Sequence, residues 1–194
     1  MTFSRSKVFV AVAVEWDETN PDIILEIGIA VLDLRSERFR SKKWPPTTWA
    51  IRPRHIIIRE NVNVHNGKYV RSNKFGYKFR KSYLASLETA VNTVNRLLSM
   101  YHWKELVIVG HHMRNALHRL RDVGIGIDRR ATLFDTAGLE RAWSRRVNGR
   151  RRNLRDICDE LEIPYYRADK MNNAGNNAFF VMAVFKEMCC VEED

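Results

Sequence analysis

The fold of this chain is decided by the stretch VFVAVAVEWDETNPDIILEIGIAVLDL, residues 8–34. Residues 8–16 are β-branched, small and aromatic with almost no polar interruption, which is typical of a strand buried on both faces. The turn-forming run DETNPD follows, and a second apolar run occupies 23–34. The stretch therefore predicts two consecutive antiparallel strands.

A third strand and a long polar segment follow. TTWAIRPRH at 47–55 comes after a Pro-Pro pair and predicts the third strand of an antiparallel meander. Residues 56–82 are polar, basic and rich in turns, and their HNGK predicts a hairpin turn. From Ser82 onward the apolar residues recur at helical spacing, with Ser86 and Thr89 as polar residues near the start. We therefore expect an excursion and then a helix.

The C-terminal half alternates short apolar strands with amphipathic helices. The predicted elements are a strand at 105–112, a helix ending at Gly124, a strand at 131–135 with a helix after it, a helix closed by Pro164, and a last helix from near Gly175 to about Met188. A meander followed by βα units predicts an α/β fold, with a mixed sheet and helices on both faces. The length favours a single domain over 1–194.

Composition excludes several classes of protein. No run of about 18 apolar residues is present, and the N-terminal stretch reaches acidic residues too early for a signal peptide. Cys158, Cys189 and Cys190 form neither a CxxC pair nor an even disulfide framework, so we expect free thiols in a reducing compartment. These features predict an intracellular protein, nuclear or cytoplasmic, with no membrane partner.

Positive charge is the most informative bulk property. The chain has 33 Lys and Arg against 23 Asp and Glu, a net charge of +10, which favours a polyanionic partner. RSNKFGYKFRKSY interleaves basic and aromatic residues, which suits single-stranded nucleic acid, and SRRVNGRRR collects five arginines. The alternative is that both are solvated loops. The candidate nucleic-acid-binding residues are Arg71, Lys74, Lys78, Arg80, Lys81, Arg145, Arg146, Arg150, Arg151 and Arg152.

Four stretches carry a resemblance to a known superfamily. They are VAVAVEWDE…ILEIGIAVLD, LVIVGHHMRNALHRL, LFDTAGL and NNAGNNAFFVM, and they span residues 10–182. In order and spacing they resemble the ribonuclease-H-like 3′-to-5′ exonucleases of the DnaQ or DEDDh type, particularly a fungal branch. The resemblance implies a ribonuclease-H-like mixed sheet. It also implies a cleft in which carboxylates hold two Mg²⁺ or Mn²⁺ ions on the scissile phosphate while a histidine acts as general base.

The residues that this family needs for catalysis are mostly replaced. Family members place Asp-x-Glu on the first strand, Asp on the helix after the GH strand end, and His with a nearby Asp on the last helix. An asparagine offers a carbonyl oxygen without charge, and an alanine offers no ligand atom. The resemblance therefore implies a pseudo-exonuclease with no confident catalytic residue, no metal site and no cofactor. The degenerate positions are Ala13, Ala116, Asn172 and Asn177, and Glu15 remains.

Other assignments stay open at this point. An unconventional Mg²⁺ or Mn²⁺ site could form from a displaced acidic group near one sheet edge, although we favour a capping or turn role for Asp135 after its strand and polar packing for the histidines. Ala13 and Ala116 could be introduced substitutions, but the two asparagines favour a naturally inactive relative. The displaced group would consist of Glu15, Asp17, Glu18, His111, His112 and Asp135.

Three functions follow from these readings. We favour a catalytically inactive protein that binds nucleic acid, more readily RNA or single strands, through its basic surface. The alternatives are a protein-interaction scaffold within a larger complex and an active metal-dependent 3′-to-5′ exonuclease with a displaced site.

Overall fold

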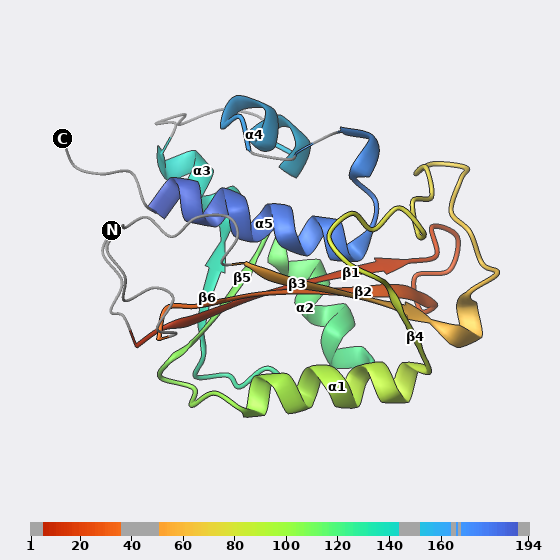
Figure 1. Ribbon diagram of the computed structural model, residues 1–194, viewed down its shortest axis with the longest axis horizontal. Coiled ribbons are helices and arrows are strands. Elements are labelled where there is room, and N and C mark those ends of the chain that lie inside the picture. Colours follow the sequence, from red (N-terminus) through yellow and green to blue (C-terminus); the bar gives the residue numbers. More distant parts are fainter. Residues whose placement is uncertain (1–5, 36–50, 144–151, 164–165, 167, 190–194) are drawn as a thin grey trace.

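A six-stranded mixed sheet organises the chain in this computed structural model (Figure 1), which describes residues 6–35, 51–143, 152–163, 166 and 168–189. The strand order across the sheet is β4-β3-β2-β1-β5-β6. The strands are β1 Val8–Trp16, β2 Ile24–Asp33, β3 Arg52–Ile58, β4 Tyr83–Ala85, β5 Leu106–Gly110 and β6 Thr132–Asp135. The α-helices are α1 Leu87–Ser99, α2 Met113–Asp122, α3 Thr136–Trp143, α4 Leu154–Glu160 and α5 Ala174–Cys189, and the 3-10 helices are η3 Arg59–Asn61 and η4 Ala168–Lys170.

The predicted meander and βα units are confirmed. Strand β2 pairs antiparallel with both β1 and β3, whereas β5 lies parallel to β1 and β6 parallel to β5. The third strand is displaced from its prediction, because the apolar residues 56–58 extend β3 and pair with β4. The predicted start of that strand, 47–50, lies outside the described residues.

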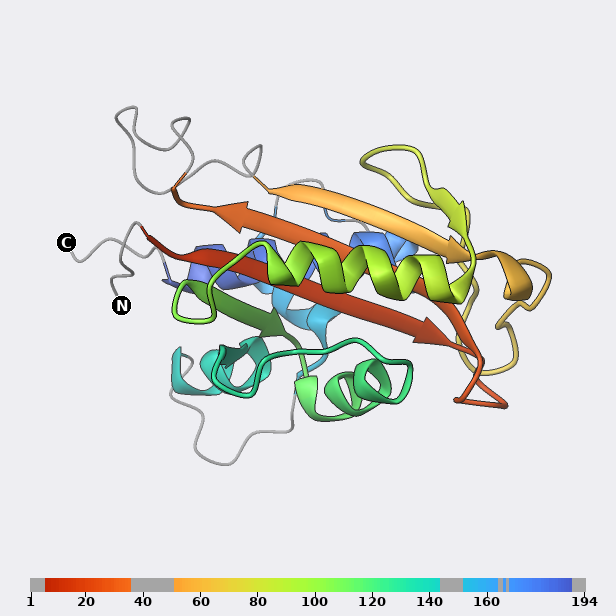
Figure 2. The ribbon, with the colours of Figure 1, turned by 90° about the horizontal axis from the view of Figure 1, so that it is seen from below.

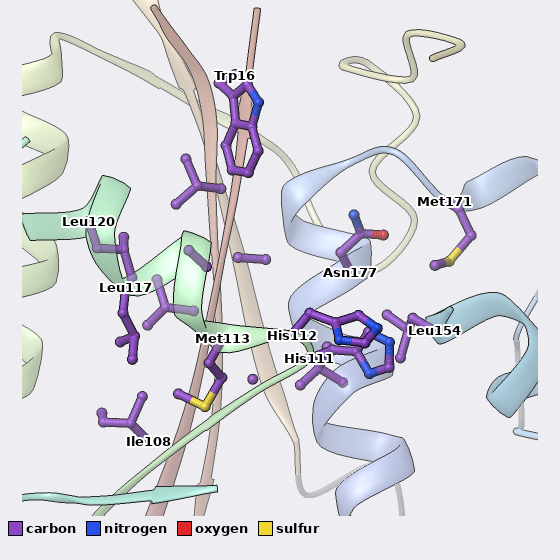
Figure 3. Close-up of a pocket in the computed structure, with 16 residues that line it drawn as sticks. Trp16, Ile108, His111, His112, Met113, Leu117, Leu120, Leu154, Met171 and Asn177 are labelled. Atoms are coloured by element: carbon purple, nitrogen blue, oxygen red, sulfur yellow. The ribbon is translucent and has the colours of Figure 1, made fainter. Parts of the chain in front are cut away.

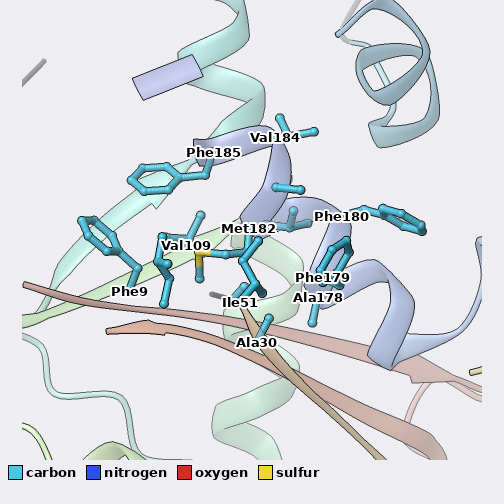
Figure 4. Close-up of a cluster of buried hydrophobic side chains, with 14 of the residues drawn as sticks. Phe9, Ala30, Ile51, Val109, Ala178, Phe179, Phe180, Met182, Val184 and Phe185 are labelled. Carbon is cyan, nitrogen blue, oxygen red and sulfur yellow. The ribbon is translucent and has the colours of Figure 1, made fainter. Parts of the chain in front are cut away.

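Helices cover both faces of the sheet, as predicted. Successive side chains of β1 point to opposite faces of the sheet, so this strand contributes to the hydrophobic core on each side. Phe9 and Ala11 pack under α5, whereas Val8 and Val10 face the opposite layer of α1 and α2. Figure 2 shows α1 crossing that second face. In the first layer the ring of Phe9 lies 4.9 Å from that of Phe185 on α5 (Figure 4). Burial of β1 on both sides therefore matches its uninterrupted apolar sequence.

Helix α5 lies directly on the sheet because two glycines remove the side chains that would separate them. A Cβ on Gly28 would stand 1.8 Å from the carbonyl oxygen of Ala174, and one on Gly175 would stand 2.6 Å from Cβ of His55. The start of α5 is thereby brought close to the carboxyl-terminal end of β1. Within the described ranges, no helix combines the length and the apolar character that a membrane crossing needs.

Residues 67–70 of the polar excursion after β3 are held by one carboxylate rather than by a hairpin. The backbone N–H groups of Gly67, Lys68, Tyr69 and Val70 donate to Glu18 over 2.6–3.0 Å. The prediction of a hairpin turn at HNGK is wrong, because this loop wraps around a side chain instead of joining two strands. Helix α1 also begins later than Ser82, since residues 83–85 form β4 and Ser86 caps the helix by accepting from N–H of Thr89.

Candidate functional site

A pocket of about 310 Å³ lies where β1 runs past the end of β5. The two strands pair only as far as Ala11, so beyond that point β1 borders the pocket on the side of β5 while it remains paired with β2 on its other side. Helix α2 and the start of α5 form the other walls (Figure 3). The lining residues are Val12, Ala13, Val14, Trp16, Ile108, Gly110, His111, His112, Met113, Ala116, Leu117, Leu120, Leu154, Met171, Asn177 and Val181.

Three of the predicted degenerate positions meet in this pocket. Ala13 comes from β1, Ala116 from α2 and Asn177 from α5, although they are far apart in the sequence. Asn172 does not line the pocket, and it adopts a left-handed backbone with φ of 60° just before α5. The remaining carboxylate, Glu15, is tied to the pocket wall because Nδ2 of Asn177 donates to its Oε1 at 2.7 Å.

Glu15 is a buried acid whose neutral form the surrounding protein favours. Burial is the main cause that raises its pKa to about 8, and the nearby charge of Glu26 acts in the same direction. The two residues are cross-strand partners in the β1–β2 register. The hydrogen bond from Asn177 lowers the pKa but does not offset the other two effects. The carboxyl group is therefore mostly protonated at neutral pH.

The acidic residues that follow Glu15 are engaged in local structure. Asp17 accepts from the N–H of Thr19 and Asn20, which closes the turn after β1. Desolvation favours the neutral form of Glu18, but the four backbone N–H groups outweigh it and lower the pKa of this carboxyl to about 2. Asp17 and Glu18 thus each have their own backbone partners. In the part of the chain that the structure describes, no group of three or more His, Cys, Asp and Glu could hold a metal ion.

Asp135 caps two helices, as the sequence predicted. Its Oδ1 accepts from N–H of His112 at 3.0 Å and its Oδ2 from N–H of Met113 at 3.1 Å, at the start of α2. The same Oδ1 accepts from N–H of Ala137 at the start of α3. A carboxylate at two helix N-termini also interacts favourably with both helix dipoles.

The two histidines provide polar packing, also as predicted. Nε2 of His111 and Nε2 of His112 lie 3.2 and 3.1 Å from the carbonyl oxygen of Arg152, and Nδ1 of His111 lies 3.0 Å from Oγ1 of Thr136. Their ring centroids are 4.4 Å apart. Burial, reinforced by the neighbouring His112, lowers the pKa of His111 to about 4, so this imidazole is neutral at physiological pH.

A buried polar cluster next to the pocket escaped the sequence predictions. Oε2 of Glu26 lies 2.7 Å from Nε2 of His55 and accepts from N–H of Ala174 at 3.1 Å. Asn173 caps α5 by accepting from N–H of Asn176, and its amide nitrogen donates to the carbonyls of Asn73 and Lys74. The cluster fixes the start of α5 against β2. A lone glutamate inside the apolar run ILEIGI is the sequence signal that could have revealed it.

The basic residues of the first predicted stretch divide into exposed and buried members. Arg71, Lys78, Arg80 and Lys81 are exposed. Lys74 is only 1% exposed, and its ammonium group donates to the carbonyls of Asn61, Val62 and Val64. Lys74 must therefore be removed from the predicted surface, because its charge serves to fold the loop. Exposed aromatic rings accompany the remaining residues: Tyr69 is 71% and Phe75 is 68% exposed.

The second basic stretch lies mostly outside the described residues, which include none of Arg145, Arg146, Arg150 and Arg151. Arg152 is described and is also a correction to the predicted surface. Its guanidinium forms ion pairs with Glu140 at 3.4 Å and with Glu160, and it donates to the carbonyl of Asp156 at 2.9 Å. These contacts join α3 to α4, so the side chain is used within the fold.

The fold and the position of the pocket define a class of protein. An antiparallel meander continued by parallel βα units, with a pocket at the carboxyl ends of β1 and β5, is the architecture of a ribonuclease-H-like exonuclease. A family model described as DNA polymerase III subunit epsilon-like, C-terminal domain, matches residues 8–188. The chain belongs to this DEDDh-type family.

Solved structures support the same fold. The Saccharomyces cerevisiae Pan2 pseudoubiquitin hydrolase-RNA exonuclease module, in complex with AAGGA RNA, is 16% identical with a TM-score of 0.55 over 95% of this chain and 29% of its own. Escherichia coli Exonuclease I, in complex with a dA13 oligonucleotide, is 11% identical with a TM-score of 0.53 over 93% of this chain and 40% of its own. At these identities the similarity establishes the fold.

Two curated relatives are yeast proteins. The Saccharomyces cerevisiae protein named Good for full DBP5 activity protein 2 is 27% identical over 97% of this chain and 36% of its own length. A second Saccharomyces cerevisiae protein, named Uncharacterized protein YDR514C, is 22% identical over 95% of this chain and 41% of its own length. This chain thus spans only about two fifths of the relatives that it matches.

Proposed function

We propose that this exonuclease-fold chain is catalytically silent and binds nucleic acid, preferentially RNA or single strands, through its exposed basic residues. The observation that carries the proposal is the chemistry of the pocket at the family's catalytic position. Ala13, Ala116 and Asn177 occupy it, and its described lining residues include no Asp, Glu, Lys or Arg. A nuclease fold that keeps the cleft but has no metal-ligating carboxylates in it is suited to binding nucleic acid rather than to hydrolysing it.

The residues present do not fit a pair of divalent cations. Mg²⁺ and Mn²⁺ require hard oxygen ligands, and two such ions bring four positive charges that carboxylates must balance. The nearest carboxyl group is that of Glu15, whose pKa is raised to about 8 and whose Oε1 is already bound to Asn177. Two alanine methyl groups and one amide cannot replace the missing ligands.

The exposed part of the first basic stretch supports the binding half of the proposal. Arg71, Arg80 and Lys81 can neutralise backbone phosphates, and the exposed rings of Tyr69 and Phe75 can stack on unpaired bases. The Pan2 module and Exonuclease I were solved with an RNA and a DNA oligonucleotide respectively, which is consistent with such a ligand for this fold.

The first experiment measures binding of labelled single-stranded RNA and DNA of about 12 nucleotides at several salt concentrations. In the triple variant Arg71→Glu, Arg80→Glu, Lys81→Glu we expect at least about tenfold weaker binding and a salt slope smaller by up to about 2, since each lost phosphate contact removes about 0.7 from the slope. The matched control is Arg96→Glu, Arg121→Glu, Arg129→Glu, which reverses three other exposed charges. Equal weakening in both variants would contradict a defined surface.

The second experiment tests catalytic silence with the same oligonucleotides. We expect no shortening of the labelled strand with or without Mn²⁺, because the pocket lacks the carboxylates that a two-metal mechanism uses. Progressive loss of nucleotides from the 3′ end in Mn²⁺ would favour the displaced-site exonuclease and overturn the proposal.

A second candidate function is a protein-interaction module. Tyr83 and Leu84 on the edge strand β4 are 61% and 51% exposed, and edge strands present unpaired backbone groups to partners. The relative whose name refers to full DBP5 activity is compatible with such a role. Isolation of the chain from cells with a stoichiometric protein and without nucleic acid would favour this candidate, whereas recovery with RNA would favour the first.

A further inference from the structure

The buried polar cluster contains a chain of contacts that ends at a serine in the loop before β4. Oγ of Ser82 lies 2.8 Å from Nδ1 of His55, and Nε2 of the same ring lies 2.7 Å from Oε2 of Glu26. A nucleophile within hydrogen-bond reach of a base, which a third group orients, is the arrangement of an activated nucleophile. None of these three residues lines the pocket described above.

The hydrogen bonds around Glu26 fix which nitrogen of His55 carries the hydrogen. Oε2 of Glu26 also accepts from N–H of Ala174 at 3.1 Å, so this oxygen acts as an acceptor. The amide nitrogen of Asn173 lies 3.4 Å from Nε2 of His55, but its two hydrogens already go to two backbone carbonyls at 3.1 Å. Nε2 therefore donates to Glu26, and Nδ1 has the lone pair that accepts the hydroxyl hydrogen of Ser82.

The three residues differ in their exposure. His55 is 0% and Glu26 is 3% exposed, so water does not compete for their hydrogen bond. Ser82 is half-buried between Lys81 and Tyr83, which are both exposed. A reactant therefore approaches Ser82 from the surface, while the base lies behind it.

The burial of His55 restricts the reactants. A leaving group at the surface has no access to the buried imidazole and cannot take a proton from it, so it must depart as a stable anion. A thiolate meets this condition, because thiols ionise near a pH of about 8.5. Arg80 and Lys81 are exposed next to Ser82, and they attract a donor whose carrier group is negatively charged.

We propose that Ser82 is an acylation site and that its acyl donor is a thioester on an anionic carrier. Oγ of Ser82 attacks the thioester carbonyl, the C–S bond breaks, and the thiolate leaves. The hydroxyl proton passes to Nδ1 of His55, and Glu26 stabilises the imidazolium that forms. The product is an ester on Ser82. The inference goes beyond the proposed function, since this reaction requires no nucleic acid.

The test compares two serines within the intact, unaltered chain. After incubation with acetyl coenzyme A, mass spectrometry follows acetylation, and hydroxylamine distinguishes an ester on serine, which it cleaves, from an amide on lysine. Ser82 should acquire its ester at least about tenfold faster than Ser86, because general-base assistance is worth about 10²–10⁴-fold. Ser86 is the matched control, since it is also half-buried but its hydroxyl donates to Oγ1 of Thr89 instead of a base.

Two further measurements report on the proton transfer. The rate at Ser82 should be lower in D₂O, because the hydroxyl proton moves in the acylation step. In Glu26→Gln the carboxamide can both donate and accept, so it no longer fixes the hydrogen on Nε2 of His55. The rate should then fall at least about tenfold, and the isotope effect should disappear. Circular dichroism checks that the variant is folded.

The outcomes decide the assignment. Equal rates of ester formation at Ser82 and Ser86, both in the unaltered chain and in Lys81→Arg, would overturn it, and this comparison does not depend on the Glu26 variant. Lys81→Arg is included because the amine of Lys81 is next in the sequence and can take the acyl group from a newly formed ester. A rate at Ser82 that is unchanged in D₂O and in Glu26→Gln would also overturn the assignment, because His55 would then take no proton.

Discussion

At the scale of single residues, the carboxyl groups near the pocket are defined by the partners that they contact. Glu15 keeps the family's residue type but not its environment, since alanine at 13 removes the neighbouring acid and Asn177 binds Oε1. Glu18 and Asp135, which sequence alone could assign to a site, instead accept backbone N–H groups. The chemistry of each carboxyl group is therefore set by its partners rather than by its identity.

A pH dependence of stability follows from Glu15. The pKa of this group rises from 4.5 to about 8 on folding, so the folded state holds a proton that the unfolded state has lost between these values. Stability should therefore fall as pH rises through this window. Between pH of about 6.5 and 8 the free energy of unfolding of the wild type should fall by on the order of 1 kcal/mol relative to Glu15→Gln, which cannot ionise.

Urea unfolding at several pH values provides the measurement. The interval begins at about pH 6.5 because His111, whose pKa falls from 6.5 to about 4 on folding, contributes an opposite slope below that value. Glu88→Gln, at an exposed position of α1, is the control and should retain the slope of the wild type. Parallel pH profiles for wild type and Glu15→Gln would contradict a raised pKa.

At the scale of elements, α5 and its contact with the sheet position the whole site. The helix carries Asn177 to the pocket and buries most of its length over β1 and β2. Gly28 and Gly175 permit the close approach, and the Glu26–His55 pair with Asn173 fixes the start of the helix. The two glycines and the hydrogen-bonded buried polar groups thus together hold α5 against the sheet.

Gly28→Ala should weaken this contact strongly. The added methyl group would lie 1.8 Å from a backbone carbonyl oxygen, which cannot move aside as a flexible side chain can. We expect a loss of about 3 kcal/mol or more in the free energy of unfolding, measured by urea denaturation. Gly138→Ala in α3 is the control: nothing lies within 4 Å of the added atom, and the helix should gain up to about 1 kcal/mol. Similar midpoints for the two variants would refute the role of Gly28.

At the scale of the whole molecule, the domain combines a retained nuclease architecture with an apolar cleft and a net charge of +10. The mixed sheet still aligns β1, β5, α2 and α5 so that positions 13, 15, 116 and 177 converge. The arrangement of the elements is thus independent of the side chains that line the pocket. This separation of fold from chemistry can be tested directly.

Restoring carboxylates should create a metal site. The triple variant Ala13→Asp, Ala116→Asp, Asn177→Asp would place three new carboxylates beside Glu15, and their mutual repulsion should lower the melting temperature without metal. Added Mn²⁺ should raise it again by several degrees, because binding to the folded state alone stabilises it. The wild type and Ala142→Asp should not respond. A comparable Mn²⁺ response of the wild type would contradict the proposed loss of the metal site.

The sequence by itself determined the order of the elements and the family to which the chain belongs. Hydrophobic alternation in VFVAVAVEW, helical spacing after Ser86 and the Asn-rich entry to α5 are local signals, because strand and helix periodicities arise within a few residues. The bounds of β3 and α1 were less well predicted, since pairing among β2, β3 and β4 set them.

Only the tertiary structure decided which side chains are available for function. Lys74 and Arg152 look like other basic residues in the sequence, but carbonyl and carboxylate groups of neighbouring segments hold their side chains within the fold. The same holds for the buried Glu26–His55 pair and for the hydrogen bond from Asn177 to Glu15. Burial and hydrogen-bond partners depend on contacts between distant segments, and local sequence patterns do not encode those contacts.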